Sequence, residues 1–215
     1  MNLDYYHTVI FDCDGVILNS NFKKTEAYKL AALDYGATQS QAEMLVDHHV
    51  KNTGISRYVK FKYFLTKILN KPFHERDFDF LIKALNKRVK EMLLECEVAE
   101  GIEQLRQLYP DQNWMVMSGG DEEEVQELLI QKKIAHFFNL GIFGSPKSKH
   151  QILEEKLMDS DFRPVIFLGD SKYDIDTAIK YEIDFLFLSG WTDFEDWESY
   201  LKNTKFQHRR YLKEL

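Results

Sequence analysis

Short apolar runs separated by helical patterns organise most of the chain. Four of these runs have the length and composition of buried strands, and polar or glycine residues follow each: 8–11, 114–117, 140–143 and 165–168. Further along, another strand is expected at 184–188, and helices are expected at 100–109, 149–158 and 172–181. Strands that alternate with helices predict right-handed βαβ units. The expected fold class is therefore α/β, with a Rossmann-like parallel sheet as its core.

The segment after the first strand has a different pattern. Residues 20–95 contain almost no strand signal, and Lys, Glu, Ala and Leu recur there at helical spacing. We therefore predict an all-helical cap domain over 19–96, inserted into a core made of 1–18 and 97–215. The tail, 191–215, is expected to be a loop followed by a short helix.

Composition narrows the class of function. The chain has 215 residues, and 28 Lys and Arg against 35 Asp and Glu give a net charge of −7. This balance lacks the basic face that nucleic-acid binding requires. No apolar run reaches the length of a membrane span, and the first eight residues lack the basic start of a signal peptide, so we expect a cytoplasmic protein. The oligomeric state stays open.

Chemically useful side chains follow the predicted strands. Open α/β sheets bind ligands at the carboxyl ends of their strands, so these residues should converge. They are Asp12, Asp14, Ser118, Gly119, Lys147, Lys149, Asp170 and Asp174. Carboxylates in such number need a cation, and hard oxygen ligands suit Mg²⁺. The spare ammonium suits a phosphate, so the sequence predicts a site for phosphoryl transfer.

The first pair of carboxylates fits a two-step reaction. Asp12 and Asp14 would share one face of an extended strand, and Gly15 allows a sharp turn after them. One carboxylate can attack phosphorus and become an aspartyl phosphate. The other can protonate the leaving oxygen and then take a proton from water. The Asp-x-Asp-Gly pattern of residues 12–15 also occurs in solvated turns. Alone, it does not decide between a catalytic pair of carboxylates and a turn.

The later motifs would bind the phosphoryl group and the cation. The Ser118 hydroxyl and the backbone N–H of Gly119 can hold a phosphate oxygen, although a plain turn is the alternative. Lys149 is favoured over Lys147 because it stands at a helix entry, where its stem is best fixed. For Asp170 and Asp174, the alternative to metal ligation is a helix N-cap and a first-turn acid.

These motifs, in this order, resemble those of the haloacid dehalogenase superfamily, in its phosphatase and phosphomutase branch with a helical cap after the first motif. The resemblance implies Asp12 as the nucleophile and Asp14 as the general acid and base, with Ser118 and Lys149 binding the phosphoryl group. Dehalogenases and phosphonatases of this superfamily lack an acid at the position of Asp14, so its presence indicates phosphoester chemistry.

The resemblance also implies a metal site. Mg²⁺ would be held by Asp12, the backbone carbonyl of Asp14 and Asp170. Asp174 would be a further ligand or would contact the ligands without binding the ion. Lys147 departs from the common pattern of the family, in which a Lys-Pro pair follows a glycine; here Pro146 precedes the lysine. The departure leaves the choice between the two lysines open.

Within the predicted cap, residues 54–57 resemble a segment of β-phosphoglucomutase and related sugar phosphatases. The resemblance implies that Arg57, together with Lys51, binds an anionic group of the substrate away from the reacting phosphate. The alternative is a loop followed by an ordinary exposed helix. His48 and His49 precede this segment, and adjacent residues of a helix face different ways, so one is expected at the core edge and one at the surface.

The leading hypothesis is a Mg²⁺-dependent phosphatase for a small phosphorylated metabolite, with a sugar phosphate favoured. The alternatives are a phosphomutase that uses the same residues and a nucleotidase. A binding domain without catalysis is the least favoured hypothesis, because every catalytic position is filled.

Overall fold

The computed structural model describes residues 3–215, and its centre is a sheet of six parallel strands. The strands are β1 (Thr8–Phe11), β2 (Asn113–Asp121), β3 (Gly141–Ser145), β4 (Val165–Gly169), β5 (Asp184–Leu188) and β6 (Gln207–Arg209). Their spatial order is β3-β2-β1-β4-β5-β6, and every neighbouring pair is parallel. The α/β class predicted from the alternation of strands and helices is confirmed.

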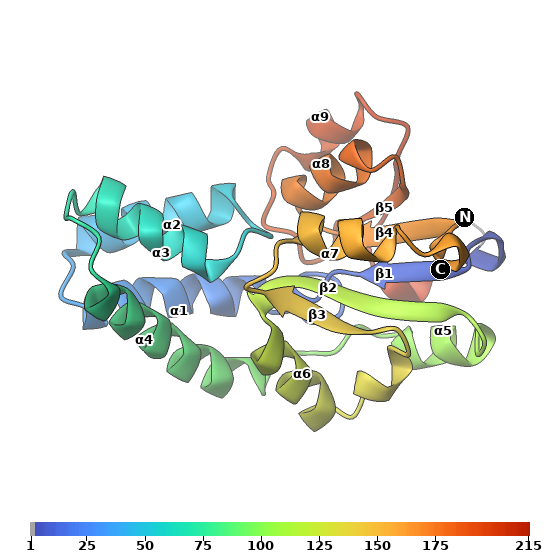
Figure 1. Cartoon of the computed structure of the whole chain (residues 1–215), viewed down its shortest axis with the longest axis horizontal. Coiled ribbons are helices and arrows are strands. Elements are labelled where there is room, and N and C mark those ends of the chain that lie inside the picture. The colour runs from blue at the N-terminus through green and yellow to red at the C-terminus, as the bar shows by residue number, and fades with distance from the viewer. Residues whose placement is uncertain (1–2) are drawn as a thin grey trace.

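Helices cover both faces of the sheet (Figure 1). One face carries α5 (Ile102–Leu108) and α6 (Glu122–Gln131). The other carries α7 (Lys149–Lys156), α8 (Lys172–Lys180) and α9 (Trp197–Leu201). Short 3-10 turns precede, connect and follow these elements: η1 (Leu3–Tyr5), η3 (Ala135–Phe137), η4 (Ser160–Phe162) and η5 (Leu212–Glu214).

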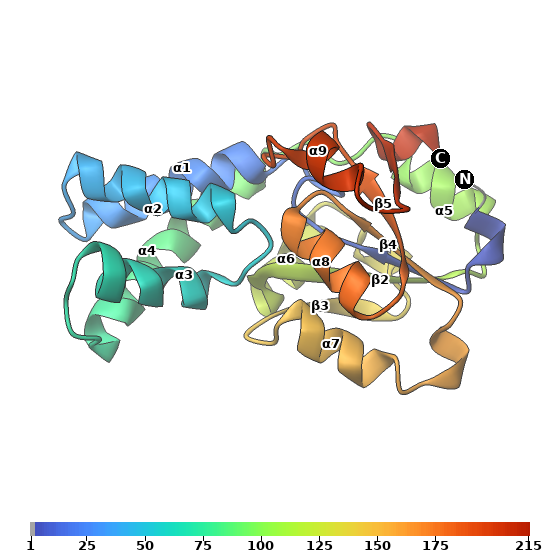
Figure 2. The same ribbon diagram turned by 90° about the horizontal axis from the view of Figure 1, so that it is seen from above.

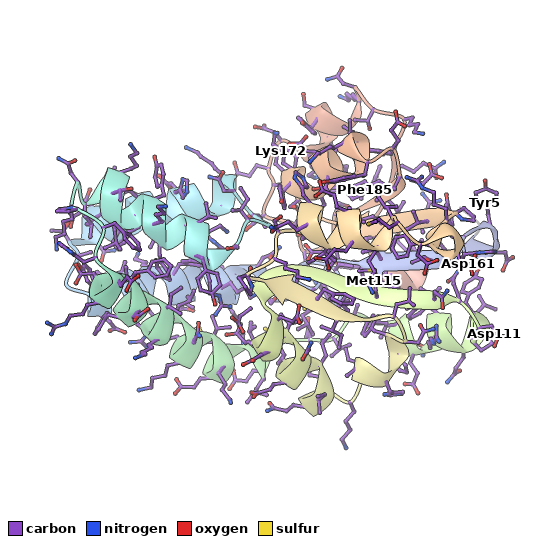
Figure 3. The ribbon with its side chains drawn as sticks, in the orientation of Figure 1. Tyr5, Asp111, Met115, Asp161, Lys172 and Phe185 are labelled. Atoms are coloured by element: carbon purple, nitrogen blue, oxygen red, sulfur yellow. The ribbon has the colours of Figure 1, made fainter. Side chains whose placement is uncertain are left out.

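Alternate strand residues divide the interior into two apolar clusters. Met115 and Phe185, labelled in Figure 3, pack with the α7, α8 and α9 side. Phe11 and Trp114 face the other way and pack with the α5 and α6 side. Side chains of a strand alternate between the two faces, so a sheet that is covered twice must be apolar on both. This explains the continuous apolar runs in the sequence.

The inserted segment is helical. It contains α1 (Asn21–Asp34), α2 (Gln39–Lys51), α3 (Arg57–Tyr63), the π-helical turn η2 (Phe64–Ile68) and α4 (Glu75–Leu93). These helices form a separate layer at the opposite end of the core from the two termini (Figures 1 and 2). The exact domain bounds, 19–96 for the cap and 1–18 with 97–215 for the core, stay predictions, and residues 1–2 lie outside the described chain.

Several element bounds differ from the sequence expectations. Strand β2 extends to Asp121, four residues beyond the predicted end, because it continues through an irregular stretch in which the register with β3 shifts. Strand β6 was not predicted at all. It is three residues long and reads Gln-His-Arg, so it has no apolar pattern that could reveal it.

Among residues 3–215, no helix is long and apolar enough to cross a membrane.

Candidate active site

The site lies where the order of strands reverses. Strands β1 and β4 are neighbours, with Phe11 opposite Leu168, and the chain builds the sheet outward from this pair in both directions. Asp12 follows β1, and Asp170 follows β4. Ligands of doubly wound sheets bind in the crevice at this switch point, outside the carboxyl ends of the strands. Both carboxylates are buried there, with Asp12 2% exposed.

Lys149 brings a positive charge to these carboxylates. It is the first residue of α7, whose start is fixed by a capping box between Ser148 and Gln151. Its Nζ lies 3.0 Å from Oδ2 of Asp12 and 2.5 Å from Oδ1 of Asp174. Burial opposes the charge, but the two carboxylates raise the pKa of Lys149 above its ordinary value. The side chain therefore stays an ammonium at the bottom of the site.

Lys147, the competing lysine of the same loop, points elsewhere. Its side chain is 50% exposed, and its Nζ donates to both carboxylate oxygens of Glu155, at 2.7 and 2.8 Å. Of the two lysines, only Lys149 reaches the carboxylates at the strand ends.

Ser118, Gly119 and Gly120 form the irregular part of β2. Three residues of β2 lie between Met117 and Asp121, whereas only one residue of β3 lies between their partners, which marks a bulge. Ser118 is fully buried, and its Oγ accepts the backbone N–H of Gly120 at 2.9 Å. Ser118 was expected after the strand and instead lies within it, because Ser-Gly-Gly carries no apolar signal for a strand.

The bulge also packs directly against the cap. A Cβ on Gly119 would lie 2.4 Å from the backbone oxygen of Gly54, which belongs to the loop between α2 and α3. No side chain fits at such a distance, so only glycine allows this approach. The loop of the cap therefore lies directly against the predicted phosphate-binding segment.

Asp14 is held by two residues that the sequence motifs do not include. Lys24 Nζ lies 2.5 Å from Oδ2, and the Ser20 hydroxyl donates to Oδ1 at 2.6 Å. Burial alone would raise the pKa of Asp14, but the Lys24 charge and these hydrogen bonds lower it. Ser20 occupies the N-cap position of α1, but its hydroxyl donates to Asp14 instead of capping the helix.

Three carboxylates have the arrangement of a cation site. Oxygen atoms of Asp12, Asp170 and Asp174 all lie within 4.8 Å of one another. Oδ2 of Asp170 accepts from Asn21 at 2.8 Å, whereas its Oδ1 is buried without a hydrogen-bond partner. A buried carboxylate oxygen without a donor is costly, and three oxygen donors of this kind fit a divalent cation such as Mg²⁺.

The pKa values agree with this reading. Burial, opposed by Lys149, raises the pKa of Asp12 to about 8, and burial together with Asp12 raises that of Asp170 well above its usual range. Each carboxylate oxygen of Asp174 has a partner. Its Oδ1 contacts Lys149, and its Oδ2 accepts a hydrogen bond from the Ser171 hydroxyl at 2.7 Å.

Arg57, the predicted substrate ligand of the cap, is engaged by the core. It is 3% exposed, and its guanidinium donates to both carboxylate oxygens of Glu124 in α6, at 2.6 and 2.9 Å, and to Asn86. Lys51, at the end of α2, is exposed. Arg57 thus joins cap to core, and its role toward a substrate stays a prediction.

The parallel sheet, the carboxylates at its switch point and the buried lysine define a hydrolase of the haloacid dehalogenase type. A family model described as haloacid dehalogenase-like hydrolase matches residues 9–188. The chain belongs to this family, which confirms the resemblance seen in the motifs and the expectation of an enzyme. No curated protein sequence gives a significant match.

Solved structures share the fold over nearly the whole chain. A predicted phosphoglycolate phosphatase from Haemophilus somnus has a TM-score of 0.75 at 15% identity, covering 99% of this chain and 97% of that one. CbbY from Rhodobacter sphaeroides, in complex with phosphate, has a TM-score of 0.71 at 14% identity, with 98% and 96% covered. The hydrolase YfnB from Bacillus subtilis, bound to magnesium, has a TM-score of 0.66 at 17% identity, with 97% and 96% covered. At these identities the likeness shows the fold alone.

Proposed function

We propose that the protein is a Mg²⁺-dependent phosphatase that hydrolyses a small phosphorylated metabolite through an aspartyl phosphate. The observation that carries the proposal is the meeting of Asp12, Lys149 and Asp170 at the switch point of the sheet. A nucleophilic carboxylate, a fixed ammonium and further carboxylates for a cation are the groups that phosphoryl transfer needs.

In the first step, a carboxylate oxygen of Asp12 attacks phosphorus, and the bond from phosphorus to the ester oxygen breaks. Lys149 would neutralise charge on the phosphoryl oxygens, and its ion pair with Asp174 supports this role because it fixes the ammonium beside Asp12. Ser118 and the backbone of the β2 bulge would bind the phosphoryl oxygens beside it. When bound, the cation would be held by Asp12, Asp170 and the Asp14 carbonyl, with Asp174 beside them, and would screen the negative charges that meet there.

Asp14 is proposed to move the protons. Once protonated, it gives its proton to the leaving oxygen in the first step, and as a carboxylate it takes one from the water that hydrolyses the aspartyl phosphate. Lys24 and Ser20 stabilise the carboxylate form, so the contacts of Asp14 favour its role as the base of the second step. Lys24 and Ser20 are thus positioning residues for Asp14.

The cavity between cap and core supports a small substrate. It is about 40 Å³ in volume, and its lining includes Asp12, Asp14 and Gly119 from the core and Arg57 and Lys60 from the cap. A space of this size holds only a few water molecules, so a substrate must enter as the cap opens and displaces water as it closes. We propose a sugar phosphate or a molecule of similar size.

The direct test is phosphate release from sugar phosphates, nucleotides and phosphoglycolate, measured with Mg²⁺ and again with excess EDTA. We expect release from at least one small phosphate ester, and its loss in EDTA with recovery when Mg²⁺ is restored. A substrate whose phosphate changes position without release would indicate a phosphomutase. If the folded protein transformed no member of the panel, the proposal would be wrong.

A further inference from the structure

Lys60 is a buried cation in the cavity that has no carboxylate partner. It lies on α3, is 2% exposed, and lines the cavity between cap and core. Within the described part of the chain, residues 3–215, no carboxylate oxygen lies within ion-pair distance of its Nζ. An ammonium that has left water without a counter-charge is expensive to bury, and burial accordingly lowers the pKa of Lys60 to about 7. The side chain is therefore charged in only part of the molecules near neutral pH, and an anion beside it would stabilise the charged form.

The immediate partners of Lys60 are neutral. Its Nζ lies 2.9 Å from Nδ1 of His49 and 5.5 Å from the centre of the Tyr28 ring. Burial, reinforced by Lys60 itself, lowers the pKa of His49 well below its ordinary value, so the imidazole is neutral and accepts this hydrogen bond at Nδ1. Burial raises the pKa of Tyr28, so its phenol is neutral as well.

The other cations of the cavity are already paired. Lys24 contacts Asp14 at 2.5 Å, and Arg57 contacts Glu124 at 2.6 Å. The carboxylate that most favours the Lys60 charge is Asp193, but it accepts a hydrogen bond from Thr53 and forms no ion pair with Lys60. Lys60 is therefore the cation of the cavity with charge left over for a ligand.

We infer that Lys60, supported by His49, forms a subsite for a second anionic group on the substrate, apart from the phosphoryl group that reacts at Asp12. This inference rests on the proposed phosphatase function and names its substrate class. The preferred substrate would be a phosphorylated sugar acid or a bisphosphate, in which a carboxylate or a second phosphate faces the cap.

The subsite also explains why a lysine suits this position. A desolvated anion gains most from an ammonium that faces no competing carboxylate, since both groups exchange solvent for each other. A neutral hydroxyl in the same place would leave the ammonium without a counter-charge. The cavity would therefore distinguish an anionic substituent from a neutral one of similar size.

Two matched pairs of probes test the inference. The carboxylate pair is 3-phosphoglycerate and glycerol 1-phosphate, which differ by a carboxylate in place of a hydroxymethyl group. The phosphate pair is glucose 1,6-bisphosphate and glucose 6-phosphate. Each is assayed with Mg²⁺ using the wild type, Lys60→Met and the control Lys62→Met, which removes an exposed lysine from the same helix. The two arms identify which anion the subsite prefers.

We expect the wild type to favour the anionic member of at least one pair by about ten-fold or more in kcat/KM, as a single paired charge allows. Lys60→Met should abolish that preference, and Lys62→Met should retain it. The inference is overturned if the wild type shows no preference in either pair, or if Lys60→Met lowers both members of the preferred pair equally. Circular dichroism and thermal unfolding would show that Lys60→Met is folded.

Calorimetric binding of the same probes separates this inference from the proposed function. If the wild type released no phosphate, yet bound the anionic member of a pair about ten-fold more tightly and lost this preference in Lys60→Met, the phosphatase proposal would fail and the subsite would stand. Equal binding of both members by the wild type would overturn the subsite, whatever the enzyme's turnover.

Discussion

The two sides of the cavity handle buried charge in opposite ways. On the core side, the ammonium of Lys149 lies between Asp12 and Asp174, and the carboxylates outnumber the cation. On the cap side, Lys60 has a neutral imidazole as its nearest partner. The core side is thus suited to a cation and a phosphoryl group, whereas the cap side is suited to an anion.

The difference shows how one cavity can separate reaction from recognition. The core residues stand at strand ends within a rigid sheet, where atoms that react must be held closely. The cap residues stand on helices that lie beyond the sheet, and the proposed function requires these helices to move as the cap opens and closes. A substrate that bridges the two sides would therefore place its second anionic group against Lys60 only when the cap is closed.

The largest expected effect on activity comes from replacing the proposed nucleophile on the core side of the cavity. Asp12→Asn keeps the size of the side chain but removes the attacking carboxylate, so phosphate release should fall by about 10⁴-fold or more. The fold should survive, because asparagine keeps the shape of the side chain and Lys149 keeps its ion pair with Asp174. The control is Asp176→Asn, a residue that pairs with Lys172 away from the site. Steady-state release by both variants checks the prediction, and an active Asp12→Asn would refute the assignment.

The second effect separates the two lysines of one loop. Lys149→Met should lower kcat by about 10² to 10³-fold, since it removes a buried cation that contacts both Asp12 and Asp174. Lys147→Met should change kcat by less than about two-fold, because its exposed pair with Glu155 contributes little. The pair of variants is compared by steady-state kinetics. A loss confined to Lys147→Met would reverse our assignment.

Much of the core side was predictable because its residues follow strands. Asp12 and Asp170 come directly after apolar runs, and parallel strands bring such positions to one edge of the sheet. Lys149 was favoured on the same kind of local evidence, a helix entry, and it is the lysine that reaches Asp12. The bulge at Ser118 was missed, because a register shift depends on the neighbouring strand and leaves no pattern in its own sequence.

The cap side was harder to predict for a physical reason. Helical spacing shows which residues share a face of one helix, but the packing of the helices decides which faces meet. In the sequence, Lys60 is one of several basic residues in its segment and has no distinguishing pattern. Only the fold places it against His49 in a cavity. Arg57 was singled out as a substrate ligand, and its ion pair with Glu124 of α6 could not be predicted, because only the fold brings the two residues together.

A third experiment breaks the contact between the two sides. Glu124→Gln leaves the buried Arg57 without its carboxylate, and we expect the free energy of unfolding to fall by about 3 kcal/mol, the lower end for breaking a buried pair. The control is Glu127→Gln, whose partner Lys90 is exposed, and which should cost less than about 1 kcal/mol. Urea unfolding measures both. Equal losses would show that the Arg57 pair is no stronger than a surface contact.

The smallest expected effect is the pH dependence of anion binding at Lys60 on the cap side. Burial lowers the pKa of Lys60 to about 7; Asp193 and Asp14 oppose this, while Lys24 and Arg57 add to it. Lys60 is therefore charged below that pH and neutral above it, so its attraction for an anion is present at low pH and lost as pH rises. Between about pH 6 and about pH 8, the preference for the anionic probe in kcat/KM should fall by up to about ten-fold.

Taking the ratio within a matched pair isolates Lys60 from the groups that react. Both members of the carboxylate pair present the same phosphate ester to Asp12 and Asp14, so the titrations of those residues cancel in the ratio. In Lys60→Met the ratio should be small and independent of pH. If that variant kept the same pH dependence as the wild type, another group would be responsible for it. If the wild-type ratio stayed constant, the charge of Lys60 would not change over this range, because its pKa would lie outside it.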